Sequence, residues 1–416
     1  MSAQDQLIRL AQGWLGNGPS RLMYLCLYDW IACAIAGMDE PAAKLLQPEG
    51  EGAAQVFGRF PMSAPNAALI NGTMGHALDY DDTHFDHIGH TSAVIMPAVL
   101  AMAQDQMLDG TSRVLDAALV GSEAAVRVGK WLGRDHYQIG YHQTATAGAF
   151  GATVALSRLM QLKRPQIHHA LGLTATMASG LKGQFGTMGK PLNAGLAART
   201  AIEAVTWAKA GMTSDPEGLE SFAATHHGVR DDAAWTDDDP WMISRISHKF
   251  HACCHGLHAA LEAIGDMRVD GDDIADMTIT THPRWMSVCN QPSPDTGLGV
   301  KFSYRHTAAM AVHGISTANI ASYSDATARD PLLVAFRDKV TVVADESLSE
   351  MQARVQVTLK DGGGLTESHD LNAPMTLEAR EVRLRDKAGA LLGSTKASAL
   401  WDALATHDTN AIFDVV

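Results

Sequence analysis

The chain has 416 residues, 46% of them hydrophobic, and its 46 acidic and 32 basic side chains give a net charge of −14. This length and apolar content allow a large core and two domains, and the negative charge argues against nucleic acid or an anionic membrane as a partner. An anionic substrate would therefore need a few cations concentrated at one site.

The cysteine content and the hydropathy of the chain suggest its compartment. The five cysteines are odd in number and show no CxxC spacing, which fits a reducing cytoplasm better than a disulfide framework. Residues 1–16 predict an amphipathic helix rather than a secretory signal. The most apolar stretch, residues 93–103, is about half of the roughly 20 residues that a membrane helix needs. We therefore expect a cytoplasmic protein without a membrane segment.

The first part of the chain, up to about residue 248, has helical periodicity throughout. Apolar residues recur three and four positions apart in residues 112–133, 144–160, 165–181 and 193–211. Ala and Gly are frequent in these segments, and small side chains let helix backbones approach closely. We expect a domain of closely packed helices.

Beyond about residue 266 the pattern changes to strands and short helices. β-Branched residues alternate with polar ones in MTITT, KVTVVAD and ARVQVTLKDG, as in half-buried strands. Short helices are predicted between these strands, at residues 306–316 and 330–338, and longer ones near the end of the chain, at residues 376–392 and 396–406.

These patterns predict the fold class and the domain order. The fold is expected to be mainly α with an α+β second domain. The helical domain would comprise residues 1–248 and 373–416, and the α+β domain residues 249–372. No internal repeat or low-complexity tract interrupts this organisation.

Four histidines and four aspartates lie in HALDYDDTHFDHIGH, residues 76–90. His84, His87 and His90 are three residues apart and could bind a metal together with nearby carboxylates. Their spacing is looser than that of established metal motifs, so we assign no metal.

The same segment has a second interpretation. Asp79, Asp81 and Asp82 lie where a predicted helix gives way to a loop, and Thr83 follows them. These side chains could cap the next helix or orient imidazoles. A purely structural role accounts easily for Asp81 and Asp82, but not for the whole cluster.

Two further stretches carry basic candidates. His142 precedes a small-residue helix in YHQTATAGAFGA, where a helix N-terminus suits an anion or a tuned imidazole, although a lone histidine there is more often structural. Lys182 and Lys190 lie in the Gly-rich stretch SGLKGQFGTMGKPLNAG. Its glycines are one position too far apart for a phosphate loop, and Pro follows the second lysine. A lysine at this helix entrance could instead hold a carboxylate.

The stretch SHKFHACCHGLH, residues 247–258, lies at the predicted domain boundary. Adjacent Cys253 and Cys254 lack the spacing of a tetrahedral zinc site, so we expect this stretch to line a cleft. GxSxG and GxGxxG are missing from the sequence, so neither a serine hydrolase nor a Rossmann cofactor site has sequence support.

Five segments in this order resemble the successive signatures of the MmgE/PrpD family: NGTMGHALDYDDTH, GYHQTATAGAFGA, ASGLKGQFGTMGKPLNAG, HACCHGLHAALEAI and KFSYRHTAAMAV. Members include 2-methylcitrate dehydratase, cis-aconitate decarboxylase and iminodisuccinate epimerase. The resemblance implies a helical domain with an α+β lid and an active site between them. It also implies a small polycarboxylate substrate, no cofactor and a homodimer.

The resemblance also implies roles for particular residues. Asp79 and Thr83 correspond to the aspartate and threonine of the family's DxDDT motif, and His90 corresponds to the histidine that follows it. His142 and Lys190 correspond to a further active-site histidine and lysine. These residues would lie together around the substrate.

Several positions outside this set bear on the substrate. Lys249 corresponds to a family lysine at the start of the lid. Asn193 replaces a histidine, Lys182 a methionine, Cys254 a histidine and His306 a tyrosine of the decarboxylase branch. These departures argue against a decarboxylase of the cis-aconitate type, and the stretch DYDDTHFDHIGH looks more like the epimerase branch.

The implied chemistry is removal of a proton next to a carboxylate, which requires cations and hydrogen-bond donors around that carboxylate. One imidazole would act as base and another as acid, in an order the sequence leaves open, and Asp79 would orient one of them and raise its basicity. We assign catalysis to His90, His142, Asp79 and Lys190, and substrate binding to Thr83, Lys182, Lys249, Cys254 and His306. The product class, elimination or epimerisation, stays open.

Two alternatives remain at this point. The His/Asp cluster could serve a metal-dependent hydrolase, or the chain could be a catalytically inactive homologue that binds carboxylates, as the substitutions at Asn193, Cys254 and His306 allow.

Overall fold

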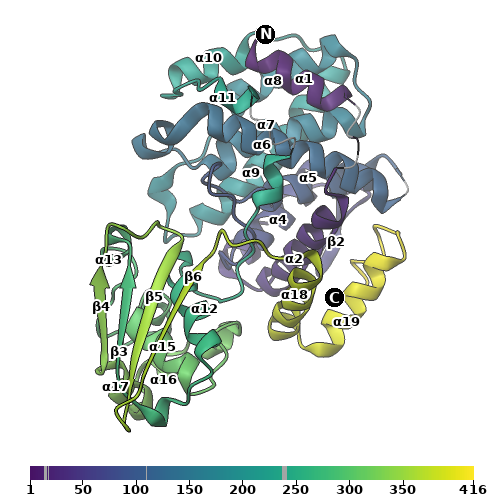
Figure 1. Ribbon diagram of the computed structural model, residues 1–416. Helices are drawn as coiled ribbons and strands as arrows, with labels where there is room; N and C mark the ends of the chain where they lie inside the picture. The colour runs from purple at the N-terminus through teal and green to yellow at the C-terminus, as the bar shows by residue number, and fades with distance from the viewer. Residues whose placement is uncertain (14–15, 17, 109, 237–240) are drawn as a thin grey trace. The chain divides into compact units, whose positions relative to one another are not determined.

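The computed structural model describes residues 1–416 except residues 14–15, 17, 109 and 237–240. The chain divides into two compact units, Met1–His248 with Leu392–Val416, and Lys249–Leu391. The first unit is helical and the second contains a small mixed sheet (Figure 1), as the sequence predicted.

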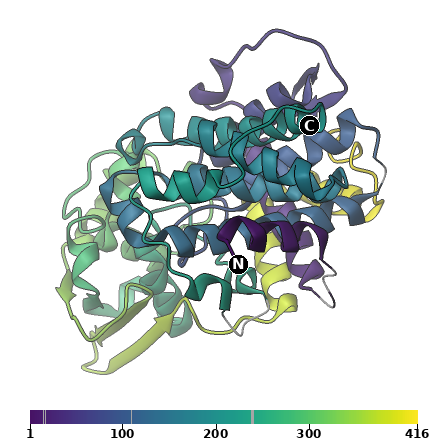
Figure 2. The same ribbon diagram turned by 90° about the horizontal axis from the view of Figure 1, so that it is seen from above.

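The helices of the first unit account for most of its residues. They are α1 (Ala3–Gln12), α2 (Ser20–Gly37), α3 (Pro41–Lys44), α4 (Ala64–His76), α5 (Ser92–Asp105), α6 (Thr111–Ile139), α7 (Gln143–Leu159), α8 (Arg164–Met177), α9 (Gly189–Lys209), α10 (Gly218–Thr225), α11 (Ala233–Thr236) and α19 (Ser394–Ala405), with 3₁₀ turns at Lys182–Gln184 and Met242–Arg245. Strands β1 (Ala54–Val56) and β2 (Arg59–Met62) form an antiparallel hairpin. Figure 2 shows the long helices of this unit lying alongside one another.

Glycines set the closest helix crossings, as the small-residue composition predicted. A Cβ on Gly195 of α9 would lie 2.2 Å from the carbonyl oxygen of Leu69 in α4. Gly121 of α6 and Gly151 of α7 face each other in the same way, since a Cβ on either would come within 2.8 Å of the other's carbonyl oxygen. Backbones therefore meet directly at these crossings.

One predicted helix ends earlier than expected. Helicity was predicted through residue 181, but α8 ends at Met177. Gly180 has a φ of 144°, which a helix does not allow, and its carbonyl accepts the backbone N–H of His142 at 2.9 Å. This extended segment therefore holds the start of α7 in place.

The second unit is built on a four-stranded sheet. Its strands are β3 (Ile274–Thr281), β4 (Val340–Ala344), β5 (Gln352–Leu359) and β6 (Gly364–Asp370). They lie in the order β4-β3-β5-β6, with β3 and β4 parallel and the other pairs antiparallel. The alternation read from the sequence is present in β5, where Ala353, Val355 and Val357 are buried.

Short helices complete the second unit. They are α12 (His258–Met267), α13 (Pro283–Met286), α14 (Gly297–Val300), α15 (Tyr304–Val312), α16 (Asp325–Ala328), α17 (Pro331–Arg337) and α18 (Leu377–Leu392), with 3₁₀ turns at His255–Leu257, Gly271–Asp273 and Ile320–Ser322. Helix α18 groups mostly with this unit, although its residues were assigned to the helical domain. Arg383 of α18 pairs with Glu262 and lies 3.8 Å above the Phe250 ring. That the chain folds as two independent domains with boundaries at residues 248 and 373 stays a prediction.

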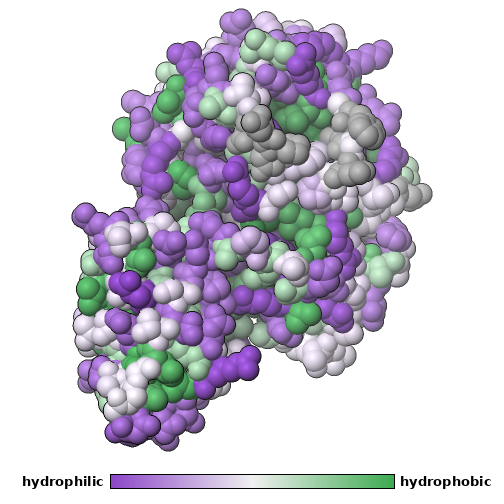
Figure 3. Space-filling model, viewed as in Figure 1, coloured by the Kyte–Doolittle hydropathy of each residue, from purple (hydrophilic) through white to green (hydrophobic). Residues whose placement is uncertain are grey.

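The surface in Figure 3 is mostly hydrophilic, with separate small hydrophobic patches. Among the described residues, no helix combines the length and the apolar character that crossing a bilayer requires.

Candidate functional site

The loop after α4 places two aspartates in different surroundings. Helix α4 ends at His76, which is buried. The backbone then turns at Asp79, whose φ of 51° is left-handed, a conformation that Asp adopts more readily than most residues. The Asp79 side chain is 51% exposed, whereas that of Asp81 is fully buried.

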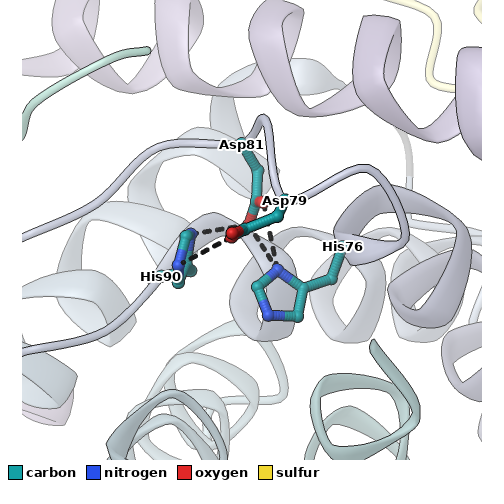
Figure 4. Close-up of side chains that lie close together, drawn as sticks. All are labelled: His76, Asp79, Asp81 and His90. Carbon is teal, nitrogen blue, oxygen red and sulfur yellow. Dashed lines mark hydrogen bonds and ion pairs between the residues drawn. The ribbon is translucent and has the colours of Figure 1, made fainter. Parts of the chain in front are cut away.

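Two imidazoles share the buried carboxylate of Asp81 (Figure 4). His76 Nδ1 lies 3.0 Å from each carboxylate oxygen. His90 Nδ1 lies 3.2 Å from Oδ2 of Asp81, and its Nε2 lies 3.5 Å from Oδ1 of Asp79. His90 is also held by its backbone N–H, which donates to Thr144 Oγ1 of α7 at 3.1 Å.

A third imidazole, that of His142, adjoins this group. It is the N-cap residue of α7 and is buried. Its ring lies nearly parallel to that of His76, with centroids 5.8 Å apart. Asn193 of α9 reaches it, with Nδ2 3.3 Å from His142 Nδ1 and 3.3 Å from the carbonyl oxygen of Leu181.

Lys190 supplies a cation to the cluster. It lies in the first turn of α9, and its Nζ is 2.6 Å from Oδ1 of Asp79. Its side chain is only 14% exposed, and the ammonium lies 5.4 Å from the ring centroid of Phe185. The cluster therefore combines three imidazoles, two carboxylates and one ammonium.

Burial sets the protonation of these groups. It lowers the pKa of His76 to about 4, although Asp81 opposes the shift. Burial and the neighbouring His76 and Lys190 lower the pKa of His142 well below its usual value. The pKa of Asp81 is well below its usual value because His76 and His90 outweigh the effect of burial. Near pH 7, His76 and His142 are neutral and Asp81 is ionised.

Asp82, next to Asp81, belongs to the helix cap instead. Ser92, the first residue of α5, donates its backbone N–H to Asp82 Oδ1 at 3.2 Å and its hydroxyl to Oδ2. Burial raises the pKa of Asp82 to about 7, with Asp81 adding to the shift and the Ser92 hydrogen bonds opposing it. The capping interpretation of this segment therefore applies to Asp82, and the orienting interpretation to Asp81.

The structure brings together the four residues assigned to catalysis, which are His90, His142, Asp79 and Lys190. Thr83 and Lys182, which were assigned to substrate binding, are close in sequence to the residues of this cluster. The contacts that the structure gives them are with residues outside the cluster. The backbone of Thr83 pairs with Ser247, each N–H donating to the other's carbonyl at 2.8 Å. Lys182 lies over the Tyr137 ring at 4.1 Å and donates to the Tyr137 carbonyl.

The other three predicted binding residues belong to the second unit. Lys249 is buried, and Cys254 Sγ accepts a hydrogen bond from Cys289 Sγ at 3.2 Å. His306 is buried, with Nε2 3.0 Å from the carbonyl oxygen of Thr327. Their binding of substrate, and the lid role of this unit, stay predictions.

The metal arrangement suggested by spacing differs from the one in the structure. His84 Nε2 lies 2.8 Å from the carbonyl oxygen of Met242, and the His87 ring packs against Gly129. Among the described residues, three sets of possible donor atoms lie within 4.8 Å of one another, and the set in this loop is His76, Asp79, Asp81 and His90. The other two are Cys26, Asp82 and His248, and Asp270, Asp272 and His313.

Sequence reasoning gave no catalytic role to His76, Asp81 or Asn193. Asp81 was noted as a possible cap or orienting group, and Asn193 as a departure from the family pattern. His76 was overlooked, although its place at the end of α4, five residues before Asp81, was a usable signal. What distinguishes these residues from their neighbours in the chain is that their side chains are buried. Burial depends on segments far away in the sequence, so local spacing does not reveal it.

The fold and the cluster define a helical unit with the groups needed for acid–base chemistry, joined to an α+β unit. The chain belongs to the MmgE/PrpD family. The family's N-terminal domain matches residues 21–225, and its C-terminal domain matches residues 251–397.

Several relatives are cis-aconitate decarboxylases. The protein of Aspergillus terreus is 30% identical over 273 residues, which cover 60% of this chain and 55% of that protein. The Mus musculus protein is 24% identical over 369 residues, covering 81% and 75%, and the Homo sapiens protein is 23% identical over 358 residues, covering 78% and 73%. This chain spans about half the length of the Aspergillus terreus relatives that it matches.

Proposed function

We propose that this protein is a lyase or isomerase that removes a proton next to a carboxylate of a small di- or tricarboxylate, without a cofactor. The observation that carries this proposal is the pair of His76 and His90 on Asp81, with His142 adjoining His76 and Lys190 paired with Asp79. Neutral imidazoles can exchange protons near pH 7.

Lys190 is the proposed electrostatic partner of the substrate. Removing a proton from carbon builds negative charge on the adjacent carboxylate, and a preorganised cation stabilises that charge. Lys190 pairs with Asp79, which is half exposed. A substrate carboxylate would compete with Asp79 for the same ammonium.

The relatives support the substrate class, since those matched are cis-aconitate decarboxylases. The reaction itself is the open part of the proposal. Asn193, Cys254 and His306 depart from the decarboxylase pattern, which favours a dehydratase-like elimination or an epimerisation of the iminodisuccinate type.

NMR in D₂O with citrate, cis-aconitate and aspartate as separate substrates tests the proposal. Deuterium in an intact carbon skeleton indicates an epimerase, a new alkene indicates a dehydratase, and loss of carbon dioxide indicates a decarboxylase. An enzyme that binds these acids but neither deuterates nor converts any of them would be an inactive carboxylate-binding homologue, and the proposal would fail.

A metal-dependent hydrolase is the second candidate, because four donor atoms lie within 4.8 Å of one another. Asp79 is paired with Lys190 in this arrangement, so a cation would have to displace the ammonium. Elemental analysis, and activity before and after treatment with a strong chelator, separate the two candidates.

We further propose that the protein is a cytoplasmic homodimer, on the basis of the family resemblance and the cysteine content. Light scattering coupled to size-exclusion chromatography measures the mass in solution, and a monomeric mass near 44.4 kDa would count against the dimer.

A further inference from the structure

The carboxylate of Asp81 favours one tautomer of His90. An ionised carboxylate attracts a proton and repels a lone pair, so the buried carboxylate of Asp81, 3.2 Å from His90 Nδ1, favours a proton on that nitrogen through its charge, although the geometry is not that of a hydrogen bond. With one proton on the ring, the lone pair is then on Nε2. Nε2 lies 3.5 Å from Asp79 Oδ1, but that carboxylate is half exposed and is paired with Lys190, so it competes weakly with the nearer and fully buried Asp81.

His76 fixes the carboxylate that orients His90. Its Nδ1 lies 3.0 Å from both oxygens of Asp81, and both side chains are fully buried. Few rotations of the carboxylate preserve these contacts in a packed interior. His76 therefore acts on His90 through Asp81.

The amide of Asn193 favours the opposite tautomer in His142. The carbonyl oxygen of Leu181 can only accept, so the amide atom 3.3 Å from it must be the NH₂ group and not the amide oxygen. The second N–H of that group points to His142 Nδ1, also at 3.3 Å. Nδ1 of His142 is thus an acceptor, and the proton of the neutral ring is on Nε2.

We propose that Asp81 and Asn193 are positioning residues that hold His90 and His142 in opposite tautomers, which makes His90 the base and His142 a hydrogen-bond donor. This inference rests on the proposed function, because it assigns roles within that reaction. Neither assignment follows from the spacing of these residues in the chain.

The reaction step balances with this assignment. The C–H bond breaks, the proton goes to Nε2 of His90, and the electron pair moves into the adjacent carboxylate. Asp81 stabilises the imidazolium that forms, as a buried carboxylate does for a catalytic histidine. Lys190 and the Nε2–H of His142 stabilise the charge on the substrate.

The tautomers of His90 and His142 can be measured in a protein that turns over no substrate. ¹⁵N NMR of the imidazoles near pH 7 distinguishes a proton on Nδ1 from one on Nε2. We expect a proton on Nδ1 of His90 and on Nε2 of His142. A His90 without a lone pair on Nε2, or a His142 with a proton on Nδ1, would overturn the inference whether or not the protein turns over a substrate.

Substitutions test the positioning residues. Asn193→Asp keeps the size of the side chain but replaces the donor with an acceptor, so we expect the proton of His142 to move to Nδ1. Asp81→Asn removes the charge next to Nδ1 of His90, so we expect the proton of His90 to be no longer confined to Nδ1. The control is Asp82→Asn on the same loop, which should leave both tautomers unchanged, and equal spectra for all three variants would refute the assignment.

Exchange of substrate protons tests the roles of base and donor. In D₂O with citrate, cis-aconitate or aspartate, we expect His90→Gln to lower the rate at least about 10³-fold, because an amide is not a base. His142→Gln keeps an N–H near the Nε2 position, and we expect a loss of about 10-fold. The reverse order would overturn the inference. If the wild-type protein exchanges no proton, the proposed function fails, and the tautomer measurement still decides the positioning.

Discussion

Replacing Gly195 with Ala would place a methyl group between α9 and α4, the helices that carry Lys190 and His76. The new Cβ would lie 2.2 Å from the carbonyl oxygen of Leu69. An ordinary contact begins near 3.4 Å, so the helices must separate by about 1.2 Å at this point. Overpacking of this kind costs about 1 to 3 kcal/mol, and backbone atoms on both sides leave little room to relax.

The same shift should reach the cluster. A displacement of about 1 Å in a catalytic group can cost about 100-fold in rate, so we expect Gly195→Ala to lower both stability and turnover. Urea unfolding followed by circular dichroism gives the free energy of unfolding. Deuterium incorporation from D₂O gives the rate of proton exchange.

Two further substitutions calibrate the result. Gly72→Ala, at the same crossing, meets Gly195 Cα at 3.0 Å and should be milder. Gly265→Ala in α12 meets nothing within 4 Å and should gain about 0.5 to 1 kcal/mol from helix propensity. If Gly195→Ala were as stable as Gly265→Ala, the close backbone crossing would be wrong. Lost stability with full activity would show that the crossing does not set the distance between Lys190 and His76.

Three more predictions concern charges. Lys190→Met should lower proton exchange at least about 100-fold, whereas Lys209→Met at the end of the same helix should not, and similar rates would exclude Lys190 from the site. Burial raises the pKa of Asp82 to about 7, so the folded protein holds a proton that the unfolded chain loses near pH 4. Wild-type stability should therefore fall by up to about 1.4 kcal/mol per unit between pH 4 and 7, and an equally steep fall in Asp82→Asn would contradict this. Burial lowers the pKa of His87 to about 3, so its contribution is complete above pH 6.5 and declines as the pH falls. Urea unfolding of His87→Gln should show a weaker acid dependence than the wild type, and an unchanged one would refute the shift.

The helices and most strands were predictable because their periodicities are local. Residues 112–133 show helical spacing of apolar residues over several turns. Residues 353–362 show the alternation of a strand over several residue pairs. Strand β6 was missed because it is polar and mostly exposed, so it has no apolar face to detect. The extended segment after Met177 was missed because Gly180 pairs with His142, 38 residues away, and periodicity does not report such contacts.

The members of the site were partly predictable, but their roles were not. The motif spacing identified Asp79, His90, His142 and Lys190. It could not show that Asp81 is buried and Asp79 half exposed, because burial depends on how the rest of the chain packs around the loop, as where Thr144 of α7 accepts the backbone N–H of His90. Asp79 was expected to orient an imidazole, but the nearer carboxylate to both His76 and His90 is that of Asp81.

Asn193 links the departure from the family pattern to the chemistry. A histidine at this position would place a group that can gain or lose a proton beside Nδ1 of His142. An amide near pH 7 does neither, so a proton given up by Nε2 of His142 could not be replaced through Nδ1. His142 then serves the proposed reaction as a donor that keeps its proton, as a neutral imidazole does when it polarises a carbonyl. Epimerisation would need a second proton for the opposite face of the carbon, and elimination of water would need one for the departing hydroxyl, so in either reaction it would come from another group or from His90 itself. The substitution that argues against a cis-aconitate decarboxylase on sequence grounds thus also assigns His142 the role of a donor, and it leaves the second proton transfer of either reaction to another group.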